Sequence, residues 1–254
     1  MSRKLNRTLL AAAWVIGLAS AASAADLPVY TKAPPPVWNW TGFYAGGNLG
    51  YSWGSADTTV SFVDGTGTVL ASSNQSIGMN GVIGGGQMGY NWQTGRWVLG
   101  LEADIQATGQ QGTATFQCGA PCVTPQSETV TEKMDWFGTV RGRLGYTVTP
   151  TVLLYGTGGL GYGDVETSGS GTSSFSSSTW KLGWTAGGGI ETRIGGNWTA
   201  KLEYLYFSDA AAPNCPPAAR VGNVCQPTPP ISASVSSGVT ADNIVRVGVN
   251  YIFK

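Results

Sequence analysis

Hydrophobic and polar residues alternate with a period of two along much of this chain. In its last segment, VRVGVNYIFK, Val245, Val247 and Val249 share one face of an extended strand, while Arg246 and Asn250 share the other. The same alternation predicts eight strands, at 41–53, 80–92, 96–107, 134–147, 151–164, 179–194, 197–208 and 243–253. Each strand is long enough to cross a bilayer at a tilt, which takes about 9–11 residues.

The connections between these strands alternate between short and long. Three turns, near 93–95, 148–150 and 195–196, carry turn-forming glycine or proline. Four segments, near 54–79, 108–133, 165–178 and 209–242, are rich in Ser, Thr, Gly, Asn and Pro, and we expect long loops there. The sequence therefore predicts an all-β fold: an eight-stranded antiparallel up-and-down transmembrane β-barrel with short periplasmic turns and long extracellular loops.

Tryptophan gathers at the ends of the predicted strands. The periplasmic ends carry Trp40, Trp92, Trp97 and Trp198, and the opposite ends carry Trp53, Trp136 and Trp180. Indole rings favour the headgroup level of a membrane. These seven residues therefore predict two aromatic girdles, one at each surface of a bilayer.

Ten charged residues lie on the strand face opposite to the aromatic residues. They are Glu102, Asp104, Arg141, Arg143, Lys181, Glu191, Arg193, Lys201, Glu203 and Arg246. An eight-stranded barrel is too narrow to enclose the aromatic face, so we expect that face to meet lipid. The charges would then form a salt-bridge network in the lumen, centred on the pairs Glu102/Asp104 and Arg141/Arg143. The strand at 151–164 does not alternate cleanly and leaves Tyr155 without an assigned face.

The N-terminal residues form a separate segment. A basic start, an apolar core at 9–19 and the small residues Ala22-Ser23-Ala24 predict a cleaved signal peptide at 1–24. A proline-rich periplasmic segment at 25–40 and the barrel at 41–254 complete the predicted organisation. Without the three basic residues of the signal, the chain keeps 11 basic against 14 acidic residues. This net charge of −3 argues against a nucleic-acid partner.

The chemistry of the chain is limited by its composition. There is no histidine, which excludes Ser-His-Asp and Cys-His sites, and we expect no enzyme activity, no metal site and no cofactor. In an exported chain the four cysteines, Cys118, Cys122, Cys215 and Cys225, predict disulfides. Local pairing of 118 with 122 and of 215 with 225 is favoured over cross-pairing, and free thiols stay an alternative.

Two blocks of the sequence carry a family resemblance. The stretches WTGFYAGGNLGYSWG at 40–54 and VRVGVNYIF at 245–253 resemble the small, porin-like outer-membrane β-barrels of alpha-proteobacteria, which include outer-membrane immunogenic proteins. The resemblance implies an OmpA-type eight-stranded barrel in the cell outer membrane and roles as a surface antigen or porin-like protein. One feature departs from the family pattern, because Lys254 follows the terminal aromatic residue Phe253 that the barrel-assembly machinery recognises.

The functional expectation is a structural barrel that supports envelope integrity and displays surface loops. Two alternatives stay open: a surface protein that binds a ligand or host through the loops at 108–133 and 209–242, and a narrow porin-like channel. The expected partners are outer-membrane lipid and, during insertion, the barrel-assembly machinery. An extracellular ligand or host surface is a further candidate partner.

Overall fold

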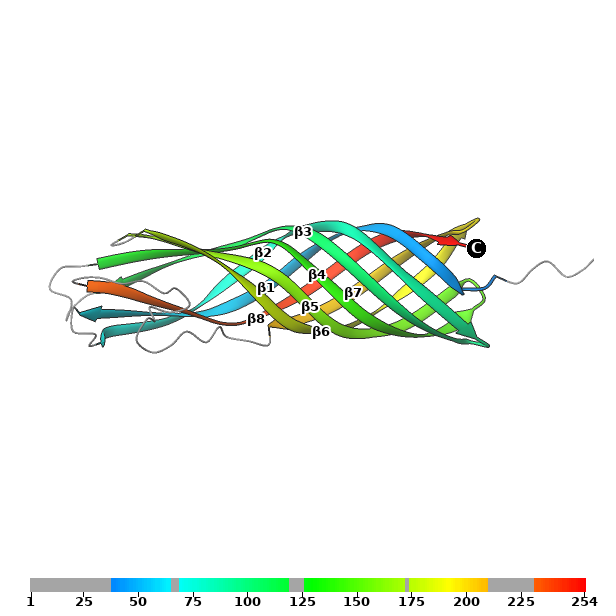
Figure 1. The fold of residues 1–254 in the computed structure, drawn as a ribbon, viewed down its shortest axis with the longest axis horizontal. Helices are drawn as coiled ribbons and strands as arrows, with labels where there is room; N and C mark the ends of the chain where they lie inside the picture. The colour runs from blue at the N-terminus through cyan, green and yellow to red at the C-terminus, as the bar shows by residue number, and fades with distance from the viewer. Residues whose placement is uncertain (1–37, 65–68, 119–125, 172–173, 210–230) are drawn as a thin grey trace, which may run out of the picture. The chain divides into compact units, whose positions relative to one another are not determined.

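Eight antiparallel strands close into a barrel (Figure 1). The structure is a computed structural model, and it describes residues 38–64, 69–118, 126–171, 174–209 and 231–254. The strands are β1 (Gly42–Asp64), β2 (Val69–Thr94), β3 (Trp97–Cys118), β4 (Gln126–Thr149), β5 (Val152–Gly171), β6 (Phe175–Gly195), β7 (Trp198–Asp209) and β8 (Ile231–Phe253). Each strand pairs with the next, and β8 pairs with β1. The predicted eight-stranded up-and-down fold is confirmed.

Most strands are much longer than the alternation predicted. The prediction of long loops at 54–79, 108–133 and 165–178 is wrong over most of their length, because β1 runs on to Asp64 and β2 already begins at Val69. Serine and threonine still alternate with apolar residues in these segments, and threonine favours strands. The hydroxyl groups of Ser61 and Ser72 lie 3.1 Å apart across the β1–β2 pair. Of the fourth segment, residues 210–230 lie outside the described part.

The barrel therefore has two unlike ends. At one end, which we call the short-turn end, tight connections join β2 to β3, β4 to β5 and β6 to β7. Gly95 and Gly196 adopt φ values of 61° and 51° in two of these turns, a conformation that glycine reaches without steric cost. At the other end, the long-hairpin end, β1 to β5 and β8 extend well past the predicted strand limits.

A β-bulge in β4 changes which residues point into the barrel. Asp135 has no partner on β5, because the paired residues step from Met134 to Trp136. The extra residue reverses the alternation. Even-numbered side chains such as Val130 and Met134 are buried before the bulge, and odd-numbered ones such as Phe137 are buried after it. The bulge thus changes which β4 side chains point inward between the long hairpin and the half of the barrel next to the short-turn end, which we call the lower barrel.

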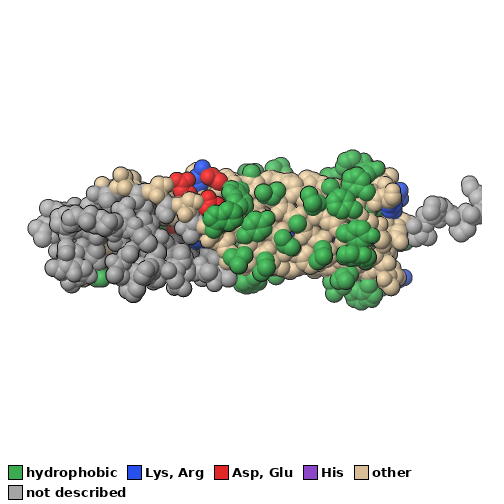
Figure 2. All heavy atoms as spheres, viewed as in Figure 1, with side chains coloured by type: hydrophobic (Ala, Val, Ile, Leu, Met, Phe, Trp, Pro, Cys, Tyr) green, Lys and Arg blue, Asp and Glu red, His purple; other side chains and the backbone are tan. Residues whose placement is uncertain are grey.

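The outer wall of the lower barrel is apolar. Figure 2 shows hydrophobic side chains spread over this wall and gathered in a belt near the short-turn end. In β8, Val245, Val247 and Val249 are exposed on the outside, whereas Arg246 and Asn250 are fully buried in the interior. The described residues include no helix that is long and apolar enough to cross a membrane. The strand face that the sequence assigned to lipid is the outer face.

Candidate functional site in the barrel interior

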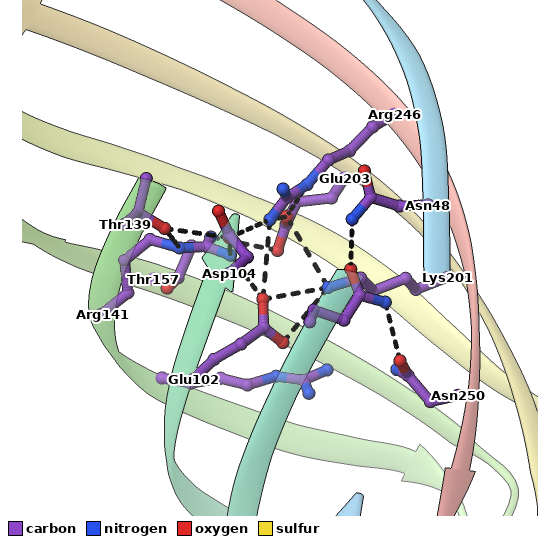
Figure 3. A network of polar contacts seen from close by, with 12 residues as sticks. Asn48, Glu102, Asp104, Thr139, Arg141, Thr157, Lys201, Glu203, Arg246 and Asn250 are labelled. Atoms are coloured by element: carbon purple, nitrogen blue, oxygen red, sulfur yellow. Dashed lines mark hydrogen bonds and ion pairs between the residues drawn. The ribbon is translucent and has the colours of Figure 1, made fainter. Parts of the chain in front are cut away.

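The centre of the lumen holds a cluster of charged side chains from different strands (Figure 3). Arg141 of β4 donates to Glu102 of β3 and, over 2.9 Å, to Asp104. Arg246 of β8 donates to the same Asp104 oxygen over 2.9 Å and from its Nε to Glu203 over 2.7 Å. The two guanidinium groups therefore share carboxylates that come from β3 and β7.

A lysine completes this central cluster. The Nζ of Lys201 on β7 donates to both carboxylate oxygens of Glu102, at 3.0 and 3.1 Å, and lies 3.8 Å from Glu203. All of these side chains are almost entirely buried. Removal of one member of a buried ion pair leaves an uncompensated charge in the interior. Each member of the cluster therefore helps to hold β3, β4, β7 and β8 in their relative positions.

A second ion pair lies beside the first cluster. Arg143 donates to Glu191 on β6, which also accepts hydrogen bonds from Thr199 over 2.5 Å and from Asn250 over 3.0 Å. The guanidinium carbon of Arg143 lies 3.7 Å from the centroid of the Tyr155 ring. The sequence grouped Arg143 with Glu102 and Asp104, but in the structure its acidic partner is Glu191.

The prediction from the sequence, which used only charged residues, did not include two tyrosines of this network. Tyr44 donates to Glu102 over 2.7 Å, and Tyr155 donates to Glu203 over 2.9 Å. Both are aromatic residues inside the barrel, on the side from which the sequence had excluded the aromatic face. Tyr44 shares its strand face with Gly46 and Gly50, and this parity was the signal that would have placed it. Tyr155, which the sequence left unassigned, points inward.

Two of the ten predicted lumen charges lie apart from the central network. Lys181 is buried inside the barrel and interacts electrostatically with Asp242. Arg193 corrects the prediction, because its side chain is exposed at the short-turn end and its Nε donates to the backbone oxygen of Gly196. Its position in the alternation is an inward one, but Arg193 lies among the last residues of β6, where the barrel wall no longer surrounds the side chain. The central network then has four bases and four acids: Arg141, Arg143, Lys201, Arg246, Glu102, Asp104, Glu191 and Glu203.

Apolar layers lie on both sides of the charged network. Toward the short turns, Trp40, Tyr44, Val98, Leu153, Tyr155 and Ile252 form one buried cluster, the lower layer. Toward the long hairpins, Ile83, Met134, Phe137, Val165, Leu205 and Ile244 form another, the middle layer. Farther along, Val60, Ile77, Phe116 and Val130 form an upper layer between the long hairpins. The lumen is therefore filled by alternating apolar and charged side chains.

Trp40 is a second correction. The sequence placed it in an outward girdle, but it is fully buried in the lower layer, where its Nε1 donates to the backbone oxygen of Pro150 over 3.2 Å. It precedes β1 and folds across the mouth of the barrel, so strand alternation does not govern its direction. Five other predicted girdle residues, Trp53, Trp92, Trp97, Trp180 and Trp198, are exposed on the outer wall. Trp136 is half-buried and packs edge-to-face on Trp180.

The predicted disulfides lie outside the described structure. Cys118 ends β3, but its side chain is not among those described, and Cys122, Cys215 and Cys225 fall in undescribed segments. No cluster of acidic or cysteine side chains in the described ranges is arranged to hold a metal ion. The chemistry that the described interior supports is thus charge pairing and packing.

Comparison with known proteins agrees with this architecture. The 31 kDa outer-membrane immunogenic protein of Brucella melitensis is 42% identical over 199 residues, which cover 74% of this chain and 81% of that protein. The 22 kDa outer membrane protein of Rhizobium leguminosarum is 36% identical over 171 residues, 67% of this chain and 65% of that protein. These relatives are outer-membrane proteins, and so is this chain.

Solved structures resemble the barrel more distantly. Neisserial surface protein A has a TM-score of 0.41 at 12% identity, and the match covers 84% of this chain and 98% of that one. Likenesses of this kind add nothing to what the strands already show. The outer membrane protein β-barrel domain family matches residues 10–253, and the chain belongs to that family.

Proposed function

We propose that this protein is a closed structural barrel that supports the outer membrane and presents its long hairpins to the outside. Bacterial barrels carry short turns in the periplasm, so we assign the short-turn end to the periplasm and the long hairpins to the cell surface. The proposal goes beyond family membership, because the family match does not say whether the barrel conducts.

The filled lumen is the observation that carries this proposal. An ion that entered from either side would meet an apolar layer before it reached the charged network. The network itself has equal numbers of opposite charges, and its side chains are almost fully buried. A narrow channel needs a path that ions can follow through the lumen, whereas apolar layers flank the charged network on both sides here.

Conductance across a planar bilayer tests the closed barrel directly. We expect the refolded protein to give no discrete single-channel steps in 1 M KCl at either sign of the voltage. Regular openings of uniform size would contradict the proposal and establish the channel alternative. A strain that lacks the protein provides the second measurement, and it should leak periplasmic proteins and become sensitive to detergent. Restoration by the wild-type gene is the control.

A surface-binding role is the second candidate, and the protruding hairpins favour it. β1 continues from Trp53, at the long-hairpin edge of the outer wall, through Asp64, and its pairing with β2 continues to Val63. Such a sheet forms a rigid platform, and preorganised surfaces lose less entropy on binding. A variant in which the β1–β2 and β3–β4 hairpins are cut back to the level of Trp53 separates the two roles. Full envelope integrity with lost surface adhesion would favour binding. Full envelope integrity with unchanged adhesion would leave the structural role alone.

A further inference from the structure

A groove crosses the outer wall near the short-turn end. Its volume is about 700 Å³, within the range of roughly 300–1,000 Å³ for small-molecule sites. The floor follows one row of register neighbours on β6, β7, β8 and β1: Thr192, Ala200, Val249 and Gly47. Thr192, Ala200 and Gly47 are smaller than Ile190, Leu202 and Leu49 in the next row, so the floor lies lower at these three positions.

Larger side chains form the two edges of this groove. Ile190, Leu202, Val247 and Leu49 are the next row toward the long hairpins, and each is between 41% and 60% exposed. On the short-turn side, Trp198 and Tyr251 pack edge-to-face with ring centroids 5.2 Å apart. The groove is thus a slot between an aliphatic ridge and the periplasmic aromatic belt, and its shape and polarity suit a hydrocarbon chain.

Two cations lie at the short-turn rim, over the ring of Trp38. Arg193 directly follows Thr192, and Lys254 directly follows β8. The guanidinium carbon of Arg193 and the Nζ of Lys254 lie 4.6 and 3.5 Å from the centroid of the Trp38 ring. Partial burial and the nearby charge of Arg193 lower the pKa of Lys254. Neither cation takes part in the ion pairs of the described residues, so the pair favours an anion.

We propose that the groove and these two cations together bind one anionic phospholipid of the periplasmic leaflet. One acyl chain occupies the slot, and the phosphate group lies near Arg193 and Lys254. The groove is continuous with the lipid-facing wall, and Trp198 marks the headgroup level next to it. This site goes beyond the proposed function and does not depend on a closed lumen.

A second copy of the chain fits this surface less well. Copies in one membrane share one orientation, so they meet with the same ends side by side. The exposed acidic residues of the described barrel, among them Asp57 and Asp135, lie toward the long hairpins. Figure 2 shows acidic side chains at that end and only Lys and Arg beyond the periplasmic belt on the visible face. A neighbouring barrel therefore brings no Asp or Glu side chain of the described residues to Arg193 and Lys254.

Native mass spectrometry of the full-length mature protein tests this site. The protein is released from micelles that contain phosphatidylglycerol and phosphatidylcholine with identical acyl chains. We expect one phosphatidylglycerol to be retained in preference to phosphatidylcholine. The substitutions R193Q and K254Q should each lower that preference roughly fivefold, while some binding of both lipids persists. The substitution A200L fills the slot and should reduce retention of both lipids.

Matched variants separate this site from general effects. A103L places the same side chain on the outer face of β3, outside the groove, and K133Q removes an exposed cation at the other end; both should behave as wild type. Heat-modifiable gel migration verifies that each variant is folded. The proposal is overturned if wild type shows no preference for phosphatidylglycerol or if A200L retains lipid normally. A dimer that A200L dissolves would assign the groove to a second copy. A conducting barrel would overturn the proposed function and leave this site standing.

Discussion

Individual residues in the lumen show why this barrel depends on charge pairing. Arg246 contacts Asp104 and Glu203 from a strand that reaches β7 and β1 on either side. It occupies the position between Val245 and Val247, whose side chains face outward. A single inward arginine thus joins the last strand to carboxylates on β3 and β7, and the penalty for removing it includes the cost of leaving those carboxylates unpaired.

Replacement of Arg246 by methionine should destabilise the barrel by about 3–5 kcal/mol, because buried Asp104 and Glu203 lose a shared cation. Urea unfolding in phospholipid vesicles, followed by tryptophan fluorescence, measures the loss. The double variant R246M/E203Q should lose less than the sum of the two single variants, since one unpaired charge is removed with its partner. Strict additivity would show that the two side chains are not coupled. K133Q, at an exposed lysine, serves as the control.

Trp40 should be the most costly tryptophan to remove. The substitution W40A leaves a cavity in the lower layer, and such losses amount to about 3–5 kcal/mol. W97A removes an exposed ring from the outer wall and should cost less. The same unfolding assay compares the two variants. Equal losses would mean that Trp40 contributes no more than a girdle residue.

At the scale of single elements, the strands illustrate what alternation predicts and where it stops. The face of β8 followed from Val245 and Arg246 alone, because a two-residue period leaves each side chain only one direction. The ends of β1 and β2 did not follow, since Ser- and Thr-rich hairpins and Ser- and Thr-rich loops have similar composition. The bulge at Asp135 left no sequence signal either, because it depends on pairing with β5.

Deletion of Asp135 tests the bulge. Without it, either Val130 and Glu132 turn outward, or the inward and outward faces of β4 exchange on the other side of the bulge. That side carries the buried ion pairs of Arg141 and Arg143, so we expect it to keep its orientation. We therefore expect the long hairpin of β3–β4 to become sensitive to protease while heat-modifiable migration of the barrel is kept. The substitution D135A retains the chain length and should stay resistant. A deletion variant that resists protease as wild type does would contradict this account.

For the molecule as a whole, the interior is organised in layers that the sequence did not reveal. The charges of the network could be predicted because they shared one strand face, from Glu102 to Arg246. The apolar layers could not, since residues such as Phe137 and Leu205 come from separate strands and meet only when the barrel closes. The exposed position of Arg193 likewise depends on where β6 ends, which alternation does not determine.

The lower and middle layers, which flank the charged network, predict how ion flow could be created. The pair W40A/L153A opens the lower layer, and F137A/L205A opens the middle layer. We expect neither pair alone to produce steady channel openings, and the quadruple variant to pass small ions. Planar-bilayer recording in 1 M KCl measures this, with V247A on the outer wall as the control. Openings in one of the double variants would show that the other layer is not a seal.

The lower layer also has a consequence for how we expect the barrel to be completed during insertion. It joins Trp40, which precedes the first strand, to Ile252 near the end of the last one. Contacts between residues so distant in sequence form slowly, because the chain must first close a large loop. The mouth can therefore be sealed only after β8 has met β1, and Trp40 stays in contact with water until that moment. The change in Trp40 fluorescence on burial is therefore expected to report the moment at which the barrel is completed.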